Sequence, residues 1–225
     1  MYKYEMHCHT AQVSRCGRID AEELVSFYHS MGYSGICITD HFLNGNTTVP
    51  SGIDWGKRIE LFMEGYKRAA AEGDRLGISV FPAWEYSFHG TDFLTYCLSE
   101  EWLYNNPDCL EWSVSEYCDR VHADGGYIIQ AHPFREDYYI EMIRLMPRHV
   151  DGVETLNACR TDFENKMADK YADAYGLLKI AGSDNHVGRL PRLAAVEFSK
   201  KIHTLEELVV AVKSGHGRSR LYNIK

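Results

Sequence analysis

Histidine and carboxylate side chains recur at a few short places in this 225-residue chain, and such side chains can hold metal ions. The first place is "HCH", in which His7 and His9 lie one residue apart. Alternate residues of a strand point to the same side, so both imidazoles would face one way. Neutral imidazole is the commonest metal ligand, so the pair could bind one ion. Two solvent-facing polar residues would also fit this spacing, and only further donors can decide between the two interpretations.

Further donors stand at the ends of later strand-like runs. They are His41 in "ITDH", Glu85 in "PAWE", His132 in "QAHPF", Glu154 and Asn157 in "VETLN", and Asp184 and His186 in "GSDNH". Each one alone could be a helix cap, a loop residue or an exposed strand end. Recurrence at the same end of successive strands favours a common site, because β/α barrels build their active sites at the carboxyl ends of their strands.

The number of donors exceeds what one metal ion needs. A single tetrahedral zinc takes four ligands, whereas this set offers at least four histidines and two or three carboxylates. Mixed imidazole and carboxylate donors suit two or three divalent transition metals, namely Zn, Mn or Fe. Ions in such clusters lie about 3.5–4 Å apart, and Glu85 is the natural candidate for the carboxylate that bridges them.

Short apolar runs that alternate with amphipathic segments must position these donors. The sequence predicts strands over 2–9, 35–40, 78–87, 92–99, 127–133, 150–157, 177–186 and 193–199, and helices over 20–32, 55–77, 114–126, 136–149, 160–176 and 204–215. Thr204 and Glu207 occupy capping-box positions of the last helix. Such alternation predicts an α/β fold with parallel strands and right-handed crossovers. About seven units favour a closed or nearly closed β/α barrel, with a doubly wound sheet as the alternative.

Composition places the chain among ordinary globular proteins and predicts one domain over residues 1–225. The formal charge of −8 argues against a nucleic-acid scaffold, although nucleotides and short oligonucleotides stay open as ligands. Seven scattered cysteines without a close CxxC pair predict reduced thiols in a cytoplasmic protein. No apolar run has the roughly 20 residues of a membrane span, and no feature indicates an oligomeric state.

The ordered motifs "HCH", "ITDH", "PAWE", "QAHPF" and "GSDNH" resemble those of the PHP (polymerase and histidinol phosphatase) family over Met6 to His186. The resemblance implies a distorted seven-stranded, TIM-like β/α barrel with a trinuclear metal centre that hydrolyses phosphoesters. It also implies three ligand sets, which are His7, His9 and Asp184 with bridging Glu85, then His41 and His186, then Glu85 and His132.

Two departures from the family pattern concern the ligand set. The family often has an Asp or His shortly after HxH, whereas "TAQVSRCG" offers only Gln12 or Cys16 there. The family also commonly has a His at the start of the strand after the bridging Glu. The run "DFLTY" puts Asp92 in that place, with His89 as the less favoured substitute. A carboxylate there would give the third metal a harder environment.

The resemblance implies a phosphoric ester hydrolase that attacks phosphorus with a metal-activated hydroxide. The expected substrate is a small phosphomonoester, histidinol-phosphate-like or nucleotide-like. No G-x-S-x-G elbow or P-loop is present, and no side chain is assigned to protonate the leaving group. Arg135, Arg160 and Arg189 follow strand ends and are the candidates to bind phosphate, because arginine forms bidentate contacts.

Two other functions fit the same residues. One is a non-catalytic, metal-binding regulatory PHP domain. The other is a metallohydrolase of the amidohydrolase type, which usually needs a bridging carbamylated lysine or a further carboxylate, and no lysine ends a strand within the motifs.

Overall fold

The computed structural model describes residues 1–224. Its strands are β1 (Tyr2–Cys8), β2 (Tyr33–Ile38), β3 (Ser79–Phe88), β4 (Thr91–Tyr96), β5 (Tyr127–Ala131), β6 (Gly152–Asn157), β7 (Leu178–Gly182), β8 (Arg192–Phe198) and β9 (Arg218–Asn223). Its helices are α1 (Ala21–Ser30), α2 (Trp55–Phe62), α3 (Glu64–Leu76), α4 (Glu100–Asn105), α5 (Val114–Ala123), α6 (Asp162–Tyr175) and α7 (Leu205–Lys213). None of these helices is long and apolar enough to cross a membrane.

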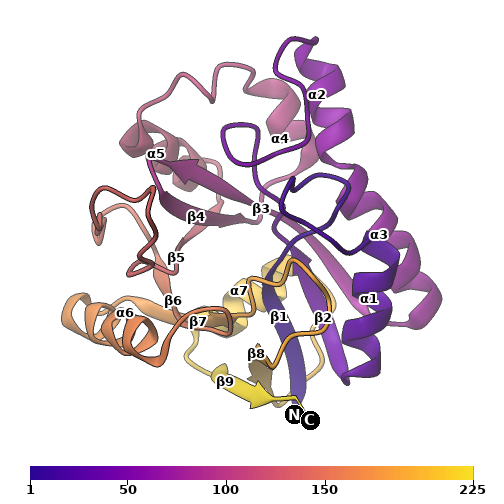
Figure 1. The fold of residues 1–225 in the computed structure, drawn as a ribbon, viewed down its shortest axis with the longest axis vertical. Coiled ribbons are helices and arrows are strands. Elements are labelled where there is room, and N and C mark those ends of the chain that lie inside the picture. Colours follow the sequence, from indigo (N-terminus) through magenta and orange to yellow (C-terminus); the bar gives the residue numbers. More distant parts are fainter. Residues whose placement is uncertain (225) are drawn as a thin grey trace.

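The strands form one curved sheet with the order β7-β6-β5-β4-β3-β2-β1-β8-β9 (Figure 1). Neighbours among β1–β2–β3 and β5–β6–β7 are parallel, whereas β4 pairs antiparallel with β3 and β5, and β8 with β1 and β9. Beyond β7 the chain returns to β1, where the Asp184 amide donates to the His7 carbonyl at 2.8 Å. The His9 amide donates to the Asn185 carbonyl at 2.9 Å. These bonds make the sheet a nearly closed barrel, which confirms the predicted α/β, TIM-like class with nine strands rather than seven.

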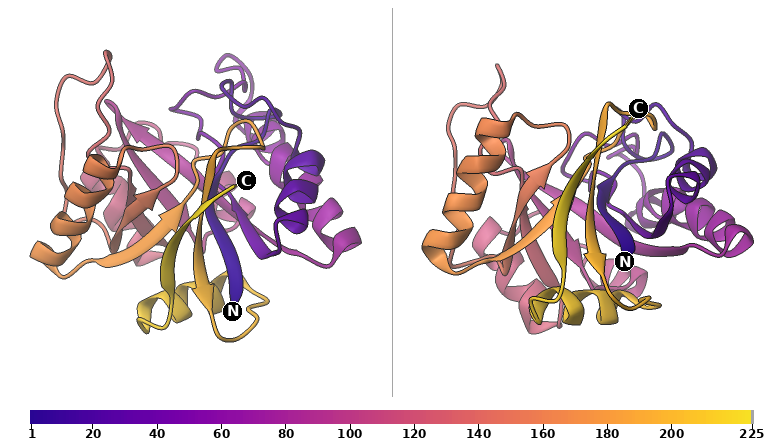
Figure 2. Two further views of the ribbon diagram at one scale, coloured as in Figure 1. Left: turned by 60° about the horizontal axis from the view of Figure 1, so that its bottom comes forward. Right: turned by 90° about the horizontal axis from the view of Figure 1, so that it is seen from below.

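An apolar core fills the amino ends of the strands. Tyr4, Tyr96, Tyr127 and Ile180 are buried together there, and Leu208 of α7 packs against them. Helix α7 lies across this end of the barrel, close to where β1 begins (Figure 2). Burying each large apolar side chain contributes roughly 1.5–3 kcal/mol, so this end stabilises the fold. The polar side chains that follow the strands gather at the opposite end.

Helices α6 and α7 begin at capping boxes. Thr204 and Glu207 form the predicted box at α7, with the Thr204 side chain accepting from the Glu207 amide. Thr161 and Glu164 form a second box at α6. Each box satisfies amides that the first helical turn leaves without a partner, so both helix starts are locally encoded.

The prediction of a helix over 136–149 is wrong, because this segment has no helix in the structure. Its apolar side chains Met142, Ile143 and Leu145 are exposed, so no buried face rewards a helix. Its backbone forms a hydrogen bond with a side chain instead, because the side-chain amide of Gln130 donates to the backbone carbonyl of Arg144 at 2.6 Å.

Three further features of the structure differ from the expectations. The single helix predicted over 55–77 is two helices, α2 and α3, that meet at Met63. Gly65 in the first turn of α3 lies against the side chains of Thr10 and Asp40, which a longer side chain could not approach. Helix α4 and strand β9 were not predicted, since both are six residues long and carry little periodic signal.

Candidate metal centre

The carboxyl end of the barrel collects the side chains that the motifs predicted. β1 carries His7 and leads directly into His9, and β2 leads into His41. β3 carries Glu85, while His132 follows β5. Asp184 and His186 follow β7, which lies beside β1 because the barrel closes there. Neighbouring strands therefore bring together residues that are far apart in the sequence.

The donors form three overlapping groups, each with ligand atoms within 4.8 Å of one another. The groups are His9, His41 and His186; His7, Glu85 and His132; and His7, His9 and Asp184. His7 and His9 each belong to two groups, and their Nε2 atoms are 3.1 Å apart. Glu85 reaches His132 Nε2 with Oε1 at 3.1 Å and His41 Nδ1 with Oε2 at 2.7 Å. The geometry suits several ions that share ligands.

Hydrogen bonds determine which nitrogen of each histidine faces the cluster. His7 Nδ1 lies 3.0 Å from the Glu154 carboxylate and must donate to it. His9 Nδ1 lies 3.0 Å from the Ser14 hydroxyl, whose only proton goes to Asp40 at 2.7 Å, so His9 must donate as well. In the neutral rings both Nε2 lone pairs then face each other. Only a shared proton or a cation relieves that arrangement.

Several buried polar atoms of the cluster have no hydrogen-bond partner among residues 1–224. They are His41 Nδ1, Glu85 Oε2 and His186 Nε2. His186 Nδ1 lies 2.9 Å from the Asp184 carbonyl, which can only accept, so His186 Nε2 carries a free lone pair. Unsatisfied buried polar atoms lower the stability of the fold. Three of them at one place fit a metal ion, because coordination to the ion would give each atom a partner. The residues present therefore fit a metal cluster.

The electrostatics of the cluster keep Glu85 and Asp184 ionised and His9 neutral, which are the forms that bind cations, whereas they favour protonated His7 when no ion is bound. Burial raises the pKa of Glu85, but the neighbouring His41 and His7 outweigh burial and hold that pKa well below its ordinary value. Burial likewise opposes ionisation of Asp184, but the neighbouring charge of His7 outweighs burial and holds the pKa of Asp184 well below normal. Burial, together with the charges of His186 and His41, lowers the pKa of His9, which stays neutral. His7 differs, because the Glu154 and Asp184 carboxylates outweigh burial and raise its pKa.

Two of the donors adopt left-handed backbone conformations that side chains rarely take. The φ angle is 26° at His132 and 53° at Asp184. Hydrogen bonds hold both residues there, since the His132 amide donates to Glu154 Oε2 at 3.0 Å and the Asp184 amide donates to the His7 carbonyl at 2.8 Å. Such strain persists where the surrounding structure determines the conformation, and it is typical of functional sites.

Glu154 orients the cluster, a role that the sequence reasoning missed. Its side chain is fully buried and accepts hydrogen bonds from His7 Nδ1 at 3.0 Å and from the Asn157 side chain at 2.9 Å. Carboxylates that hold a ligating histidine in this way fix its tautomer and raise its basicity. The signal in the sequence was the carboxylate of "VETLN", where the strand pattern could not separate a ligand from a supporting residue.

The segment after HxH contains the two residues proposed to fill the gap in the ligand pattern. Gln12 lies away from the cluster, because its amide donates to Asp20 at 2.8 Å and its oxygen accepts from the Ala21 amide at the start of α1. Cys16 lies beside the cluster, with Sγ 3.2 Å from His41 Nε2, although it is not a member of the three donor groups. Burial raises the pKa of the Cys16 thiol, but the neighbouring His186 and His41 outweigh burial and lower that pKa to about 6.

A cleft of about 670 Å³ opens beside the donors. The residues that line it include His41, Asp184 and His186, and also Arg135 and Arg160. The volume lies within the range of about 300–1,000 Å³ that is typical of small-molecule sites. The cleft therefore has room for a small ligand that touches both the donor cluster and the arginines.

The other predicted site residues fall in and around this cleft. Asp92 lines it but belongs to none of the three donor groups, and its carboxylate pairs with Arg135 at 2.7 Å. A role for Asp92 at the third metal stays a prediction. His89 also lines the cleft and is likewise not part of any donor group. Arg189 is exposed and is not one of the residues that line the cleft.

Comparison with known proteins matches one part of the chain to a family model. Residues 162–216 match the family model described as PHP-associated. No curated protein has significant sequence similarity to the chain. The PHP-associated match confirms the resemblance to the PHP family that the motifs predicted.

Several solved structures share the fold. One is a two-domain protein from Bacteroides vulgatus, described as containing a predicted PHP-like metal-dependent phosphoesterase, with a TM-score of 0.72 and 15% identity over 97% of this chain. This chain spans 64% of the length of that protein. A protein from Bifidobacterium adolescentis, provisionally described as a metal-dependent phosphoesterase, has a TM-score of 0.59 and 14% identity over 92% of this chain and 94% of its own. An amidohydrolase from Chromobacterium violaceum, with bound sulfate and no metal, has a TM-score of 0.57 and 14% identity over 93% of this chain and 96% of its own. These likenesses show the fold that this chain shares with the three proteins.

Proposed function

We propose that this PHP-like chain is a metal-dependent phosphoesterase that hydrolyses a small phosphomonoester. The observation that carries the proposal is the set of three interlocking donor groups beside a cleft that also presents two arginines. Metal ligands and phosphate-binding groups in one cleft are the combination that phosphoester hydrolysis requires.

The donor groups would hold two or three divalent ions. His7, His9 and Asp184 would hold one ion. Glu85 would connect this position to the position beside His132 and to the position beside His41 and His186. When bound, such ions make water a nucleophile at neutral pH and neutralise charge on the phosphoryl oxygens. Glu154 and Ser14 hold the histidine rings in the orientation that this binding needs.

Arg135 and Arg160 would hold the phosphate. Arg135 is fixed at one end, where its Nη2 pairs with Asp92 at 2.7 Å. The Nε atoms of Arg135 and Arg160 are buried and have no hydrogen-bond partner among residues 1–224. Buried guanidinium donors without a partner are suited to phosphate oxygens, which accept several hydrogen bonds at once.

The cleft favours a small substrate. Asn44 and Asn46, from the loop after β2, line the cleft together with Tyr139, whose ring lies 5.7 Å from the Arg135 guanidinium carbon. These side chains offer polar and aromatic contacts to the group that carries the phosphate. The formal charge of −8 disfavours a long polyanionic substrate.

Replacing Arg135 tests the phosphate-binding role. We expect Arg135→Ala to raise KM for phosphomonoesters roughly 10- to 100-fold, since a hydrogen bond to a charged group contributes about 1.5–3 kcal/mol. Metal content should stay unchanged, because Arg135 bonds to Asp92 and the Gly90 carbonyl and neither belongs to the three donor groups. Arg75→Ala is the control, because Arg75 pairs with Glu72 on exposed α3. Unchanged kinetics towards every phosphoester hydrolysed by the unmodified protein would remove this assignment.

A second candidate is an amidohydrolase activity, which the fold shared with the Chromobacterium violaceum protein favours. No lysine lines the described cleft, so the bridging carbamylated lysine common in amidohydrolases has no counterpart there. A substrate panel that contains both phosphomonoesters and amides separates the two. Turnover of phosphomonoesters without turnover of amides supports the phosphoesterase, and the reverse result supports the amidohydrolase.

A further inference from the structure

The loop between β1 and α1 holds Cys16 beside the His9, His41 and His186 group. The Arg15 amide donates to the Asn46 carbonyl at 2.8 Å, and the Gly17 amide donates to the Ser14 carbonyl at 2.9 Å. The Arg18 amide donates to the carbonyl of His186 itself at 2.7 Å. Backbone bonds on both sides of Cys16 therefore fix its position relative to the imidazoles.

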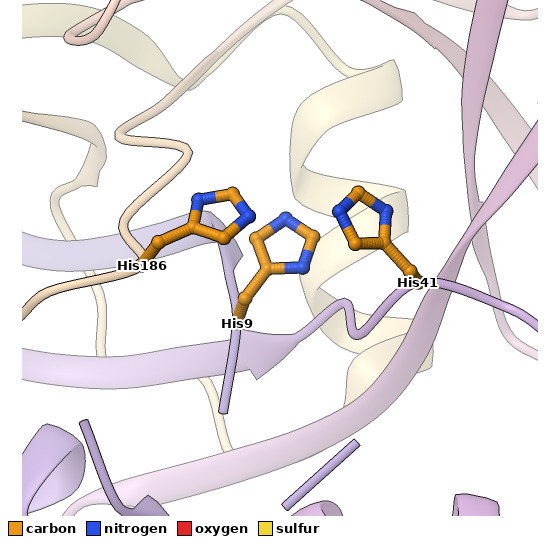
Figure 3. A group of neighbouring side chains, drawn as sticks. All are labelled: His9, His41 and His186. Carbon is orange, nitrogen blue, oxygen red and sulfur yellow. The ribbon is translucent and has the colours of Figure 1, made fainter. Parts of the chain in front are cut away.

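The three histidines are arranged around one region of space. In Figure 3 the His9 ring lies between those of His41 and His186. The ring centroids of His9 and His186 are 4.0 Å apart, and those of His9 and His41 are 4.5 Å apart. His186 Nε2 and His41 Nδ1 are buried without a hydrogen-bond partner in the described chain. The region is therefore built for an additional group.

Cys16 is the only one of the two candidate residues after HxH that reaches this region. Its Sγ lies 3.2 Å from His41 Nε2, and it lines the cleft with His41 and His186. Gln12 is occupied at the start of α1, where its amide donates to Asp20 at 2.8 Å. The nearby carboxylate Glu85, only 1% exposed, leaves Oε2 without a hydrogen-bond partner within residues 1–224 and 2.7 Å from His41 Nδ1.

We propose that Cys16 is a thiolate metal ligand that joins His9, His41 and His186, and that it makes this position selective for zinc over manganese. Thiolate and imidazole donors favour Zn²⁺, whereas carboxylate-rich sites suit Mn²⁺ and Mg²⁺. The other two groups contain Glu85 or Asp184, so the thiolate distinguishes one position of the cluster from the rest. Binding displaces the thiol proton to solvent. The inference rests on the proposed metal centre but not on the identity of the substrate.

X-ray absorption at the zinc edge of the zinc-loaded protein tests this assignment directly. We expect a sulfur neighbour at about 2.3 Å in the unmodified protein, the distance of a zinc–thiolate bond. The sulfur signal should disappear in Cys16→Ser and persist in Cys159→Ser. Cys159 is the matched control because it lines the same cleft, with Sγ 3.6 Å from the Asp184 carbonyl. Loss of sulfur in Cys159→Ser with retention in Cys16→Ser would overturn the proposal, as would zinc without any sulfur neighbour in the unmodified protein.

Cobalt substitution gives a second readout that does not depend on activity. The Co²⁺-loaded protein should show a near-ultraviolet thiolate-to-cobalt charge-transfer band that Cys16→Ser lacks. Cys16→Asp, which supplies an oxygen donor, should bind Co²⁺ without this band and should gain affinity for Mn²⁺ relative to Zn²⁺. Matching circular dichroism spectra and melting temperatures establish that the variants fold.

The outcomes separate this inference from the proposed function. A protein that binds metal and hydrolyses phosphomonoesters without a sulfur ligand refutes the role of Cys16 and leaves the phosphoesterase standing. A charge-transfer band that depends on Cys16, in a protein that hydrolyses no phosphoester, supports the ligand and refutes the phosphoesterase.

Discussion

At the scale of single residues, the site depends on which nitrogen each imidazole presents. Glu154, Ser14 and the carbonyl of Asp184 each accept a hydrogen bond from the Nδ1 atom of one histidine. Each of these bonds leaves the Nε2 lone pair of its ring facing the cluster. Preorganised lone pairs lower the cost of binding an ion, because the rings need not reorient. The supporting residues therefore matter to metal affinity without touching the metal.

Glu154→Gln tests this orienting role. The amide can donate to His7 Nδ1 and so favour the tautomer with a protonated Nε2, which cannot bind metal. We expect metal affinity to fall about 10- to 100-fold, the usual effect of losing such a partner. Competition against a chromophoric chelator measures the change, and Glu23→Gln on the exposed surface of α1 is the control. Equal affinities in the two variants would show that Glu154 has no orienting role.

Alkylation of the metal-free protein tests the electrostatics around Cys16. The neighbouring His186 and His41 outweigh burial and lower the thiol pKa to about 6 from an ordinary value of 9.0. A lowered pKa means that the thiolate, the reactive form, already dominates at pH 7. Iodoacetamide should modify Cys16 at a rate that rises through pH 6 and levels off above about pH 7. Mass spectrometry measures the rate for each cysteine.

Cys159 is the internal control in the same experiment. Burial raises its pKa to about 12, so its rate should stay low at pH 7 and rise at higher pH. A Cys16 rate that continues to climb through pH 9 would contradict the predicted thiolate.

At the scale of elements, the site exists because β7 lies close against β1. Gly182 ends β7, and a Cβ atom there would overlap both the His7 side chain and the Glu154 carboxylate. A glycine at this point lets the two strands approach, and the following residues bring Asp184 next to His7. The spacing between two strands thus determines whether the ligands of one metal can meet.

Gly182→Ala should damage both the fold and the site. Forcing a methyl group into this contact should lower the free energy of unfolding by about 1–3 kcal/mol, as overpacking does in other cores. It should also reduce metal content, because His7 and Glu154 must move. Denaturant unfolding and metal analysis measure the two effects. Gly52→Ala is the control, since a Cβ at Gly52 meets nothing within 4 Å. If both variants retained full stability and metal content, close strand approach would not limit the site.

The sequence predicted the donors better than their surroundings. Seven of the eight predicted donors lie in the three donor groups, because each stands in or just after a strand and strand periodicity is a strong local signal. The eighth, Asp92, belongs to none of these groups. The pairing of Arg135 with Asp92 is a contact between distant segments, which no local pattern reveals. The segment 136–149 was expected to be helical from its composition, but its tertiary environment offers no face to bury. The direction of β4, β8 and β9 likewise depends on pairing rather than on local sequence.

At the scale of the whole molecule, the barrel separates stability from chemistry. Helix α7 covers the amino ends of the strands (Figure 2). Large apolar side chains fill that end, while buried histidines and carboxylates occupy the carboxyl ends. The buried polar cluster costs stability in the absence of an ion, because its lone pairs and charges are desolvated and incompletely paired. A fold that retains such a cluster does so for function, and the proposed function uses all three donor groups together.

The most direct test of this account combines metal analysis with a phosphatase assay on one purified sample prepared without chelators. We predict two or three equivalents of divalent transition metal per chain, together with phosphomonoester hydrolysis that chelation abolishes and added metal restores. A protein that binds these metals and hydrolyses no phosphoester would contradict the proposed catalysis and favour a regulatory metal-binding domain. A protein that binds no metal at all would contradict the central claim.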